Sequence, residues 1–384
     1  MRLLNTSTRE FEEFDNDFPP YAILSHTWVK GEEVTLQDLQ KYHEFIAQDS
    51  PASTSISSRV GFKKIEGCCD LALRDGLNYA WIDTCCIDKT SSAELTEAIN
   101  SMFKWYKGSD VCYAYLAEVK DATEDFSAAD SSFRQSSWFK RGWTLQELLA
   151  PRKIQFFSKE WELIGQMDKF TKLCDVVSSI TLIPPIYLEG KPLREASVAQ
   201  RMSWASNRET TREEDIAYSL LGIFDVNMPL LYGEGNKAFR RLQEAIMASI
   251  HDHTILAWGY LPWDEEYSTR DTDSECPILA TSPADFRSCY DLVGYGRPSP
   301  YEMTNMGLKI QLRPRHLKHH EQKMWPGHRH LVVALNCFSQ RGPSRQIAII
   351  LGHDFDTRVF HNLKLCIKLN ESEYDSSTIR CSPA

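Results

Sequence analysis

A segment near the middle of the chain carries a carboxylate and an indole at a spacing that could form a binding surface. Residues 138–150 read WFKRGWTLQELLA. At about 100° per residue in a helix, Trp143 and Glu147 are i, i+4 neighbours with Lys140 beside them, and the leucines of the segment lie on the other side. A carboxylate held beside an indole is partly desolvated, which raises its pKa or directs its charge at a cationic ligand.

Helix geometry alone favours a plainer interpretation of the same residues. Trp143 would then pack under the helical segment that follows residue 160, and Glu147 would pair with Lys140. The chemistry of the segment therefore depends on which other polar groups the fold brings close to it.

Polar side chains follow two apolar runs in the first part of the chain. Ser25, His26 and Trp28 come directly after the run at 21–24, and Asp83 follows the run at 79–82. In open parallel α/β sheets, ligands bind in the crevice beyond the carboxyl ends of the strands. We therefore expect these side chains to line one binding site.

Other motifs have explanations that need no chemistry. Residues 233–238 read GEGNKA and match a dinucleotide-binding pattern, but they do not follow a strand of a βαβ unit, so a tight turn between helices is expected. The histidines between 316 and 330 lack carboxylates or cysteines at ligand spacing, and a solvated loop is expected there rather than a metal site. The acids at 208–215 are expected to supply first-turn charges of a helix.

The elements that must position the candidate residues follow the pattern of an α/β fold. Short apolar runs alternate with helical stripes, which is typical of a mainly parallel sheet. Serine-rich residues 50–58 are expected to form a loop, and residues 138–150 a helix that ends before Pro151. Strands are predicted near 21–25, 78–82, 111–116 and 153–157.

The pattern changes twice further along the chain. Residues from about 165 to 250 are expected to form a helical extension that packs on the sheet. Beyond them, period-two alternation at 308–312 and 363–369 predicts antiparallel strands with one solvated face. We therefore expect an α/β domain at 1–255, followed by a smaller β-rich accessory region at 256–384 that carries no catalytic residues.

Composition excludes several classes of protein. The 384 residues are 42% hydrophobic and 25% charged, as in an ordinary globular protein, and the net charge of −10 argues against a nucleic-acid binder. No apolar run approaches the about 20 residues that a membrane span needs, and the N-terminus lacks the apolar stretch of a signal peptide. The 11 cysteines are odd in number and include no CxxC pair, which indicates reduced thiols and a cytoplasmic location.

Six stretches of the sequence form an ordered set of motifs: YAILSHTW, GFKKIEGCCDLALRDGLNYAWIDTCCIDK, AELTEAINSMFKWY, CYAYL, WFKRGWTLQELLAP and MSWASNRETTREEDIAYSLLGIFDVNMPLLYGEGNKAFRRLQEAI. Together these stretches resemble the HET (heterokaryon incompatibility) domain of filamentous fungi. They run in order from about residue 21 to residue 247 and cover nearly two thirds of the chain. One departure is Val29, where the family often has glycine.

The HET domain is in turn remotely similar to TIR domains, the flavodoxin-like signalling modules of plant and animal innate immunity. Several TIR domains cleave NAD with one glutamate, which in plant members lies in a W-C-L-x-E-L helix. Residues 143–148 have the same form, with Thr144 in place of the cysteine. The resemblance implies that Glu147 is catalytic, and that the fold is a TIR-like, mainly parallel sheet.

The same resemblance implies a nucleotide site around Glu147. Ser25, His26 and Trp28 are similar in position to the loop after the first TIR strand, which flanks the nucleotide. We expect Trp143 to lie beside it, and the order of the strands places Asp83 there. NAD is expected as the substrate, with no other cofactor and no metal.

Two functions follow from the resemblance. The first is a programmed cell death effector of heterokaryon incompatibility that acts as an NAD glycohydrolase, a hydrolase of the nicotinamide–ribose bond. The second is a non-enzymatic death-signalling adaptor that acts through homotypic assembly. Expected partners are NAD or a related nucleotide, together with a second copy of the chain or another incompatibility protein.

Overall fold

The computed structural model describes most of the chain and divides it into two compact units. The described residues are 1–15, 17–167, 172–260, 277–296, 298–305, 307–316, 330–340, 345–353 and 360–369. One unit comprises Met1–Lys191 together with Arg208–Thr210, and the other comprises Pro192–Asn207 and Thr211–Ala384. The boundary expected near residue 255 falls inside the second unit and stays a prediction.

A seven-stranded sheet forms the centre of the first unit, in the order β2-β1-β4-β3-β5-β6-β7. The four strands β4, β3, β5 and β6 are parallel to one another. Each of them coincides with a predicted strand, so the mainly parallel α/β fold is confirmed. The strands are β1 Arg2–Asn5, β2 Phe11–Glu13, β3 Tyr21–His26, β4 Tyr79–Trp81, β5 Val111–Tyr115, β6 Ile154–Phe157 and β7 Leu163–Met167.

The strand order has a functional consequence. Numbered along the chain, the parallel strands lie in the order 2-1-3-4, which is the doubly wound order of flavodoxin-like folds. The chain leaves β3 in one direction to form β4 and returns past it to form β5, so the connections cross opposite faces of the sheet. The switch point between β3 and β5 is where such folds bind ligands, beyond the carboxyl ends of the strands.

Antiparallel strands extend the sheet at both edges. β1 pairs with β2 and with β4, while β7 forms a hairpin with β6. These strands were not predicted, because each is short and β2 and β7 are rich in polar or exposed residues. Edge strands need no second buried face, so they lack the continuous apolar run that marks the central strands.

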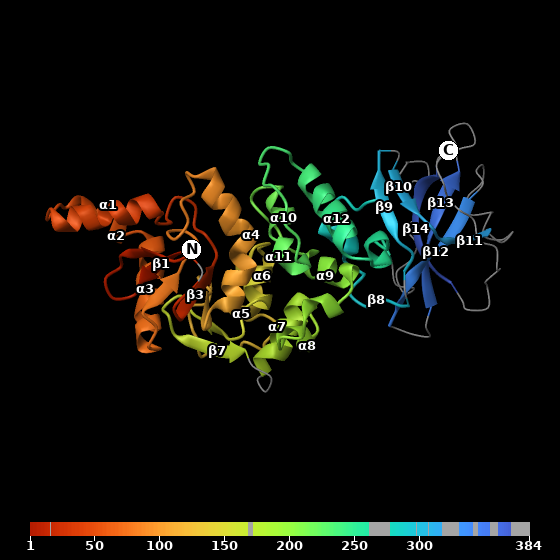
Figure 1. Ribbon diagram of the computed structural model, residues 1–384. Coiled ribbons are helices and arrows are strands. Elements are labelled where there is room, and N and C mark those ends of the chain that lie inside the picture. Colours follow the sequence, from red (N-terminus) through yellow and green to blue (C-terminus); the bar gives the residue numbers. More distant parts are fainter. Residues whose placement is uncertain are drawn as a thin grey trace. The chain divides into compact units, whose positions relative to one another are not determined.

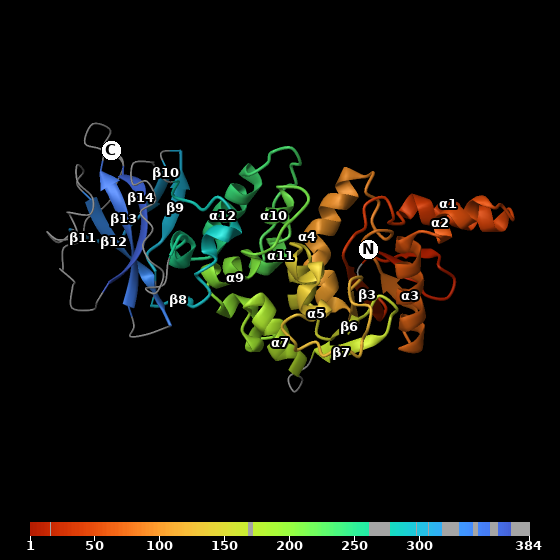
Figure 2. The same ribbon diagram turned by 180° about the vertical axis from the view of Figure 1, so that it is seen from behind.

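Helices cover both faces of this sheet. α3 (Val60–Arg74) connects towards β4, and α4 (Ser92–Gly108) connects β4 to β5; α3 lies on one side of β3 and α4 on the other (Figures 1 and 2). α3 ends two residues before Gly76, which has φ +78°, and the Ser91 hydroxyl caps α4. The loop prediction for residues 50–58 is wrong in its centre, because Ala52–Ser57 forms α2 after α1 (Leu36–Ala47).

Helices make up much of the rest of the first unit and the beginning of the second unit. The first unit continues with α5 (Ser132–Gln135), η1 (Ser137–Lys140), α6 (Thr144–Leu149), α7 (Lys172–Thr181) and α8 (Pro185–Leu188). The second unit begins with η2 (Leu193–Glu195), α9 (Val198–Ala205), α10 (Asp215–Tyr218), α11 (Leu221–Phe224), α12 (Lys237–Ser249), η3 (His253–Leu256) and η4 (Pro283–Phe286). Across the described ranges, no helix is both long and apolar enough to cross a bilayer.

The β-rich part of the second unit is antiparallel throughout its described pairings, as the alternation predicted (Figure 1, blue). β9 pairs with β10, and β11 to β14 form a sheet in which β8 joins β12. The strands are β8 Leu292–Gly294, β9 Tyr301–Thr304, β10 Gly307–Ile310, β11 Arg313–His316, β12 His330–Ser339, β13 Arg345–His353 and β14 Phe360–Leu369. The loop expected to carry most of the histidine cluster lies outside the described residues. So does the acidic stretch DEEYSTRDTDSE at 264–275, whose sequence predicts an exposed loop.

The glycine-rich motif at 233–238 forms a turn before α12. The backbone N–H groups of Gly233 and Gly235 donate to the Glu214 carboxylate at 2.7 and 3.0 Å. A hydrogen bond from its own backbone N–H and those from Gly235 and Gly233 hold the pKa of Glu214 below its ordinary value. An internal carboxylate therefore occupies the position that a phosphate would take in a dinucleotide-binding loop.

Candidate functional site

The fold brings the sequence-predicted residues to one end of the sheet. Ser25 and His26 are the last two residues of β3, and Asp83 lies two residues beyond the end of β4. Because β3 and β4 are parallel, these residues share the carboxyl edge of the sheet. Glu147 comes from α6, in the connection between β5 and β6.

Glu147 is held at this edge by a direct hydrogen bond from the strand. The Ser25 hydroxyl donates to Oε2 of Glu147, and it accepts a hydrogen bond from the indole Nε1 of Trp138 at 2.8 Å. Ser25 and Trp138 are completely buried, and Glu147 is 5% exposed. The three side chains form a buried chain of hydrogen bonds that runs from Trp138 through Ser25 to Glu147.

Burial sets the ionisation of this carboxyl group. The pKa of Glu147 is raised to about 8, mainly by burial and in smaller part by the charge of nearby Asp83. The hydrogen bond from Ser25 and the charges of Arg141 and Arg208 act in the opposite direction. A carboxyl group with a pKa near neutrality in a polar site is typical of catalytic residues.

The helix predicted for residues 138–150 is wrong, because the segment forms two short helices. After η1 the chain is extended at Arg141 and pairs with Glu209: the Gly142 N–H donates to Glu209 O at 2.8 Å, and the Glu209 N–H donates to Lys140 O at 2.7 Å. These hydrogen bonds replace those of a continuous helix, so η1 ends at Lys140 and α6 begins at Thr144. Trp143 keeps helical backbone angles as the N-cap, so its i, i+4 relation to Glu147 holds, and its side chain is half-buried.

The break also removes the plainer interpretation of Glu147. Lys140 is exposed, whereas the Glu147 carboxylate is buried and accepts from Ser25. The expected Glu147–Lys140 pair is therefore replaced by a buried contact with the strand.

A second group of polar side chains surrounds Asp83. Its carboxylate binds Nε2 of His26 through Oδ1 and the indole Nε1 of Trp28 through Oδ2, both at 3.0 Å. The Lys89 ammonium lies 3.7 Å above the Trp28 ring. Burial raises the pKa of Asp83, but the hydrogen bond and charge of His26, with Lys89 and Trp28, lower it below its ordinary value.

This second group includes both a buried ring nitrogen and an exposed ring. Nδ1 of His26 is buried and has no hydrogen-bond partner among the described residues. Trp28 is 42% exposed although its N–H is anchored. A fixed, exposed indole beside an ionised carboxylate is suited to contact a planar or cationic ligand.

The carboxyl groups of Asp83 and Glu147 therefore differ in their pKa values. Glu147 has a raised pKa and Asp83 a lowered one, and Asp83 lies close enough to raise the pKa of Glu147. Such a divided pair can provide a proton-exchanging group and a permanent negative charge in one site. No group of three or more metal-binding side chains occurs in the part of the chain that the structure describes.

Arg208 is a member of the site that the sequence prediction missed. Its Nη1 donates to the carbonyl of Arg141 at 2.7 Å and to the Thr144 hydroxyl at 2.9 Å, at the start of α6. Burial lowers the pKa of Arg208 to about 9, against the effect of Glu147. Its Nη2 is buried without a partner among the described residues. The residue lies in a polar run ahead of a helix, in which the sequence indicated a role only for the acids.

The loop after β3 is fixed against α3. The buried ammonium of Lys64 donates to the Thr27 carbonyl at 2.9 Å and pairs with Glu33 at 2.5 Å. Gly61 allows α3 to contact the backbone of residues 32–34 directly: a Cβ there would lie 2.7 Å from three backbone atoms. The loop that carries Trp28 is thus held at both of its ends.

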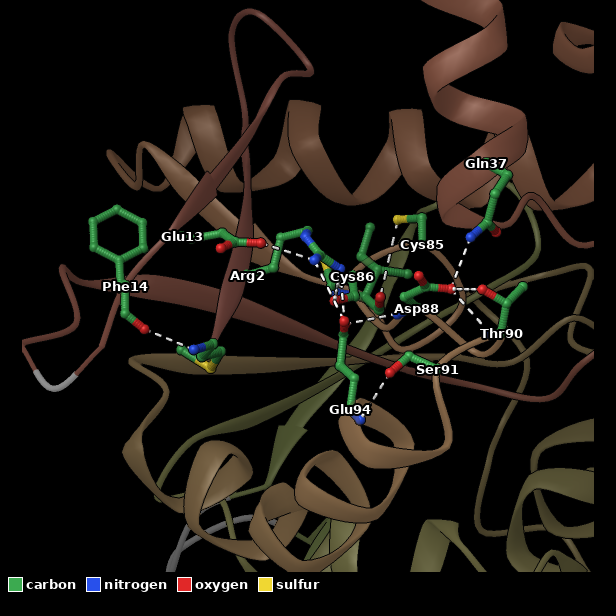
Figure 3. A network of polar contacts seen from close by, with 12 residues as sticks. Arg2, Glu13, Phe14, Gln37, Cys85, Cys86, Asp88, Thr90, Ser91 and Glu94 are labelled. Atoms are coloured by element: carbon green, nitrogen blue, oxygen red, sulfur yellow. Dashed lines mark hydrogen bonds and ion pairs between the residues drawn. The ribbon is translucent and has the colours of Figure 1, made fainter.

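The loop after β4 is fixed by a separate network of charged groups (Figure 3). Arg2 of β1 donates to Glu94 of α4 at 2.8 Å, and Glu94 also accepts from the Asp88 N–H at 2.7 Å. The Gln37 amide of α1 donates to the Asp88 carboxylate at 2.8 Å. The connection that carries Asp83 is therefore tied to three elements, and Asp83 keeps its place beside His26.

Comparison with known proteins supports the resemblance predicted from the motifs. The family described as "Heterokaryon incompatibility protein (HET)" matches residues 21–132, and a "Domain of unknown function (DUF8212)" matches residues 237–293. "Vegetative incompatibility protein HET-E-1" of Podospora anserina is 48% identical over 233 residues, which cover 59% of this chain and 16% of that protein. The chain thus spans about a sixth of the length of this relative.

These matches confirm the resemblance to the HET domain. The matched residues 21–132 include Ser25, His26, Trp28 and Asp83, whereas Glu147 lies beyond them. No solved structure matches the chain, and the similarity to TIR domains stays a prediction.

Proposed function

We propose that this chain acts in heterokaryon incompatibility, as a cell death effector that hydrolyses NAD at the bond between nicotinamide and ribose. The match to the HET family and the name of the Podospora relative support the incompatibility role. The observation that carries the chemistry is the position of Glu147, buried beside Ser25 at the carboxyl end of β3.

The reaction needs a single well-placed carboxylate. Water adds to C1′ of the ribose while the C1′–N bond breaks, and its electron pair stays with nicotinamide, which leaves as a neutral molecule. The water gives up one proton, so the products are nicotinamide, ADP-ribose and a proton. Positive charge develops on the ribose ring in the transition state, and a nearby carboxylate stabilises it.

The substrate itself favours the active form of Glu147. With a pKa of about 8, this group is mostly protonated at neutral pH in the free protein. The nicotinamide ring of NAD is cationic, and a cation close to a carboxyl group lowers its pKa. Binding of NAD would therefore ionise Glu147 at the moment when its charge is needed.

The surrounding residues have separate roles in this proposal. Asp83 stays ionised and accepts hydrogen bonds from ribose hydroxyls, and His26 holds it in place. Trp143 is the N-cap residue of α6 and a neighbour of Glu147, where its ring can stack on nicotinamide. Trp28 offers an exposed ring to the remainder of the nucleotide.

Release of nicotinamide tests the proposal directly. The purified chain is incubated with NAD, and nicotinamide and linear or cyclic ADP-ribose are separated by chromatography. We expect Glu147→Gln, which keeps the shape and removes the charge, to lower turnover by about two to four powers of ten. Glu97→Gln, on the exposed face of α4, is the matched control and should retain full turnover.

Expression of the same variants in fungal cells separates the two candidate functions. If the parent chain releases no nicotinamide, or Glu147→Gln kills cells as effectively as the parent, the enzymatic proposal is wrong. A death-signalling adaptor, which needs the surface but not the carboxylate, then takes its place. Chromatography of the chain with and without NAD shows whether it self-associates.

A further inference from the structure

The hydrogen bond between Trp138 and Ser25 has a direction that chemistry fixes. An indole N–H is a donor only, so the Ser25 oxygen must accept at the 2.8 Å contact with Trp138. A serine hydroxyl has a single proton, and its other short contact is with Oε2 of Glu147. The Ser25 proton therefore points at Glu147, and Oε2 of Glu147 is the acceptor.

Trp138 is itself held rigidly in place. Its ring packs edge-on against Phe139 and Phe156 at centroid distances of 5.1 and 5.5 Å. Its carbonyl accepts a hydrogen bond from the Thr144 hydroxyl at the start of α6, and its side chain is completely buried. The indole N–H cannot turn elsewhere without opening this packing.

We propose that Trp138 is a positioning residue for the reaction: its indole N–H orients the Ser25 hydroxyl so that the hydroxyl proton is always donated to Oε2 of Glu147. This inference rests on the proposed function of Glu147. Its first consequence is that any proton that Glu147 gains or loses is carried on Oε1, while Oε2 stays anchored to the strand. Its second consequence is that the ionised form of Glu147 has a permanent donor.

The anchored donor acts together with the charges around Glu147. Arg141 and Arg208 favour the ionised form, while Asp83 and burial oppose it. The buried groups Tyr106 and Cys112 also lie near enough to feel the Glu147 charge, and burial keeps the pKa of both well above the ordinary range. Among these influences on the pKa of Glu147, the hydrogen bond that Ser25 donates is the one that depends on Trp138. Hydrogen bonds in a chain strengthen one another, so loss of the first weakens the second.

The test removes the indole N–H and leaves a ring. Trp138→Phe should raise the pH midpoint of NAD cleavage by about one unit, and the rate below the midpoint falls about tenfold for a shift of that size. The control is Trp81→Phe, because the Trp81 indole is equally buried and its N–H has no partner among the described residues. Both changes remove the same volume, but only the first removes a hydrogen bond, so Trp81→Phe should leave the midpoint unchanged.

A double-mutant cycle with Ser25→Ala separates positioning from simple packing. Ser25→Ala alone should raise the midpoint at least as far as Trp138→Phe does. In the Ser25→Ala background, Trp138→Phe should produce no further shift, because its effect passes through the hydroxyl. Independent shifts that add, a rate that falls equally at every pH, or an unchanged midpoint in Ser25→Ala would overturn the inference.

A direct titration keeps this test separate from the proposed activity. The carboxyl infrared band of Glu147, identified by subtraction of the Glu147→Gln spectrum, is followed against pH in each variant. If the parent chain releases no nicotinamide, the proposed function fails, but the titration still reports whether Trp138→Phe raises the Glu147 midpoint. An unchanged infrared midpoint in a folded Trp138→Phe protein would overturn the positioning role.

Discussion

The Ser25 hydroxyl donates a hydrogen bond to the Glu147 carboxylate across a separation of 122 residues. One partner ends a central parallel strand, and the other lies on a short helix in the connection two strands later. The bond therefore links the ionisation of Glu147 to the native packing of the sheet. Anything that moves β3 against α6 changes both the stability of the fold and the charge at the site.

Stability should depend on pH through Glu147. The pKa of its carboxyl is about 8 in the folded chain and about 4.5 when exposed, so the folded state holds an extra proton between these values. Stability is therefore unaffected by this group below about pH 4.5 and falls as pH rises towards 8, with a limiting slope of about 1.4 kcal/mol per pH unit. Urea unfolding at pH 6 and pH 8, followed by tryptophan fluorescence, measures the loss.

Glu147→Gln isolates this contribution from those of other titrating groups. The variant has no carboxyl to ionise, so between pH 6 and 8 it should lose roughly 2 kcal/mol less stability than the parent. Equal losses in the two proteins would mean that Glu147 is not protonated in the folded state at pH 6.

Removal of the Arg208 charge should raise the pKa of Glu147. Arg208 favours the ionised form of Glu147, so Arg208→Met should raise the pH midpoint of Glu147 measured by infrared spectroscopy. The hydrogen bonds that Arg208 donates to the Arg141 carbonyl and the Thr144 hydroxyl are also lost, which should cost about 1–3 kcal/mol of stability. Arg240→Met, at an exposed i, i+4 pair on α12, is the control and should leave both quantities unchanged.

The central fold was accessible from sequence because its strands are buried on both faces. The runs that form β3 and β5 are entirely buried, and such strands appear as continuous apolar segments. β1 and β2 gave no such signal, since they have only four and three residues, RLLN and FEE, and neither contains a continuous apolar run. Their contribution became visible only through the Arg2–Glu94 contact that fixes the loop after β4.

The residues of the site could be predicted only in part from the sequence. Position at the ends of predicted strands pointed to Ser25, His26 and Asp83. Glu147 was singled out by the resemblance to TIR domains, since helix geometry alone favoured a pair with Lys140. The break between η1 and α6 could not be predicted, because it depends on pairing with Glu209 across a separation of more than 60 residues. Nothing in the local sequence indicates that the indole N–H of Trp138 meets Ser25.

Gly61 should be essential for the loop that carries Trp28. A Cβ at this position would meet Glu32 O, Glu33 Cα and Val34 N at 2.7 Å, and backbone atoms cannot move aside as a flexible side chain can. Gly61→Ala should therefore cost about 1–3 kcal/mol and displace the loop. Faster tryptic cleavage at the exposed Lys30 and a lower Tm would report both effects.

A glycine at the end of α4 provides the comparison for this prediction. A Cβ at Gly108 meets only the Tyr21 hydroxyl at 3.4 Å, so Gly108→Ala should leave Tm and cleavage unchanged or raise Tm slightly. If both alanine variants behave alike, the contact between α3 and residues 32–34 does not hold the loop.

Neutralisation of Asp83 should lower the pKa of Glu147, whereas removal of the Arg208 charge should raise it. Asp83 is ionised, and its charge raises the pKa of Glu147, so Asp83→Asn should lower the infrared midpoint of Glu147 below about 8. More of the carboxylate is then present at pH 6–7 in the free protein. If Asp83 serves only through its charge on Glu147, NAD cleavage at that pH should rise. If it also binds the ribose hydroxyls as proposed, the KM for NAD should rise while the midpoint still falls. Midpoints that move in the same direction in Asp83→Asn and Arg208→Met would contradict the electrostatic account of the site, because the two substitutions remove charges of opposite sign.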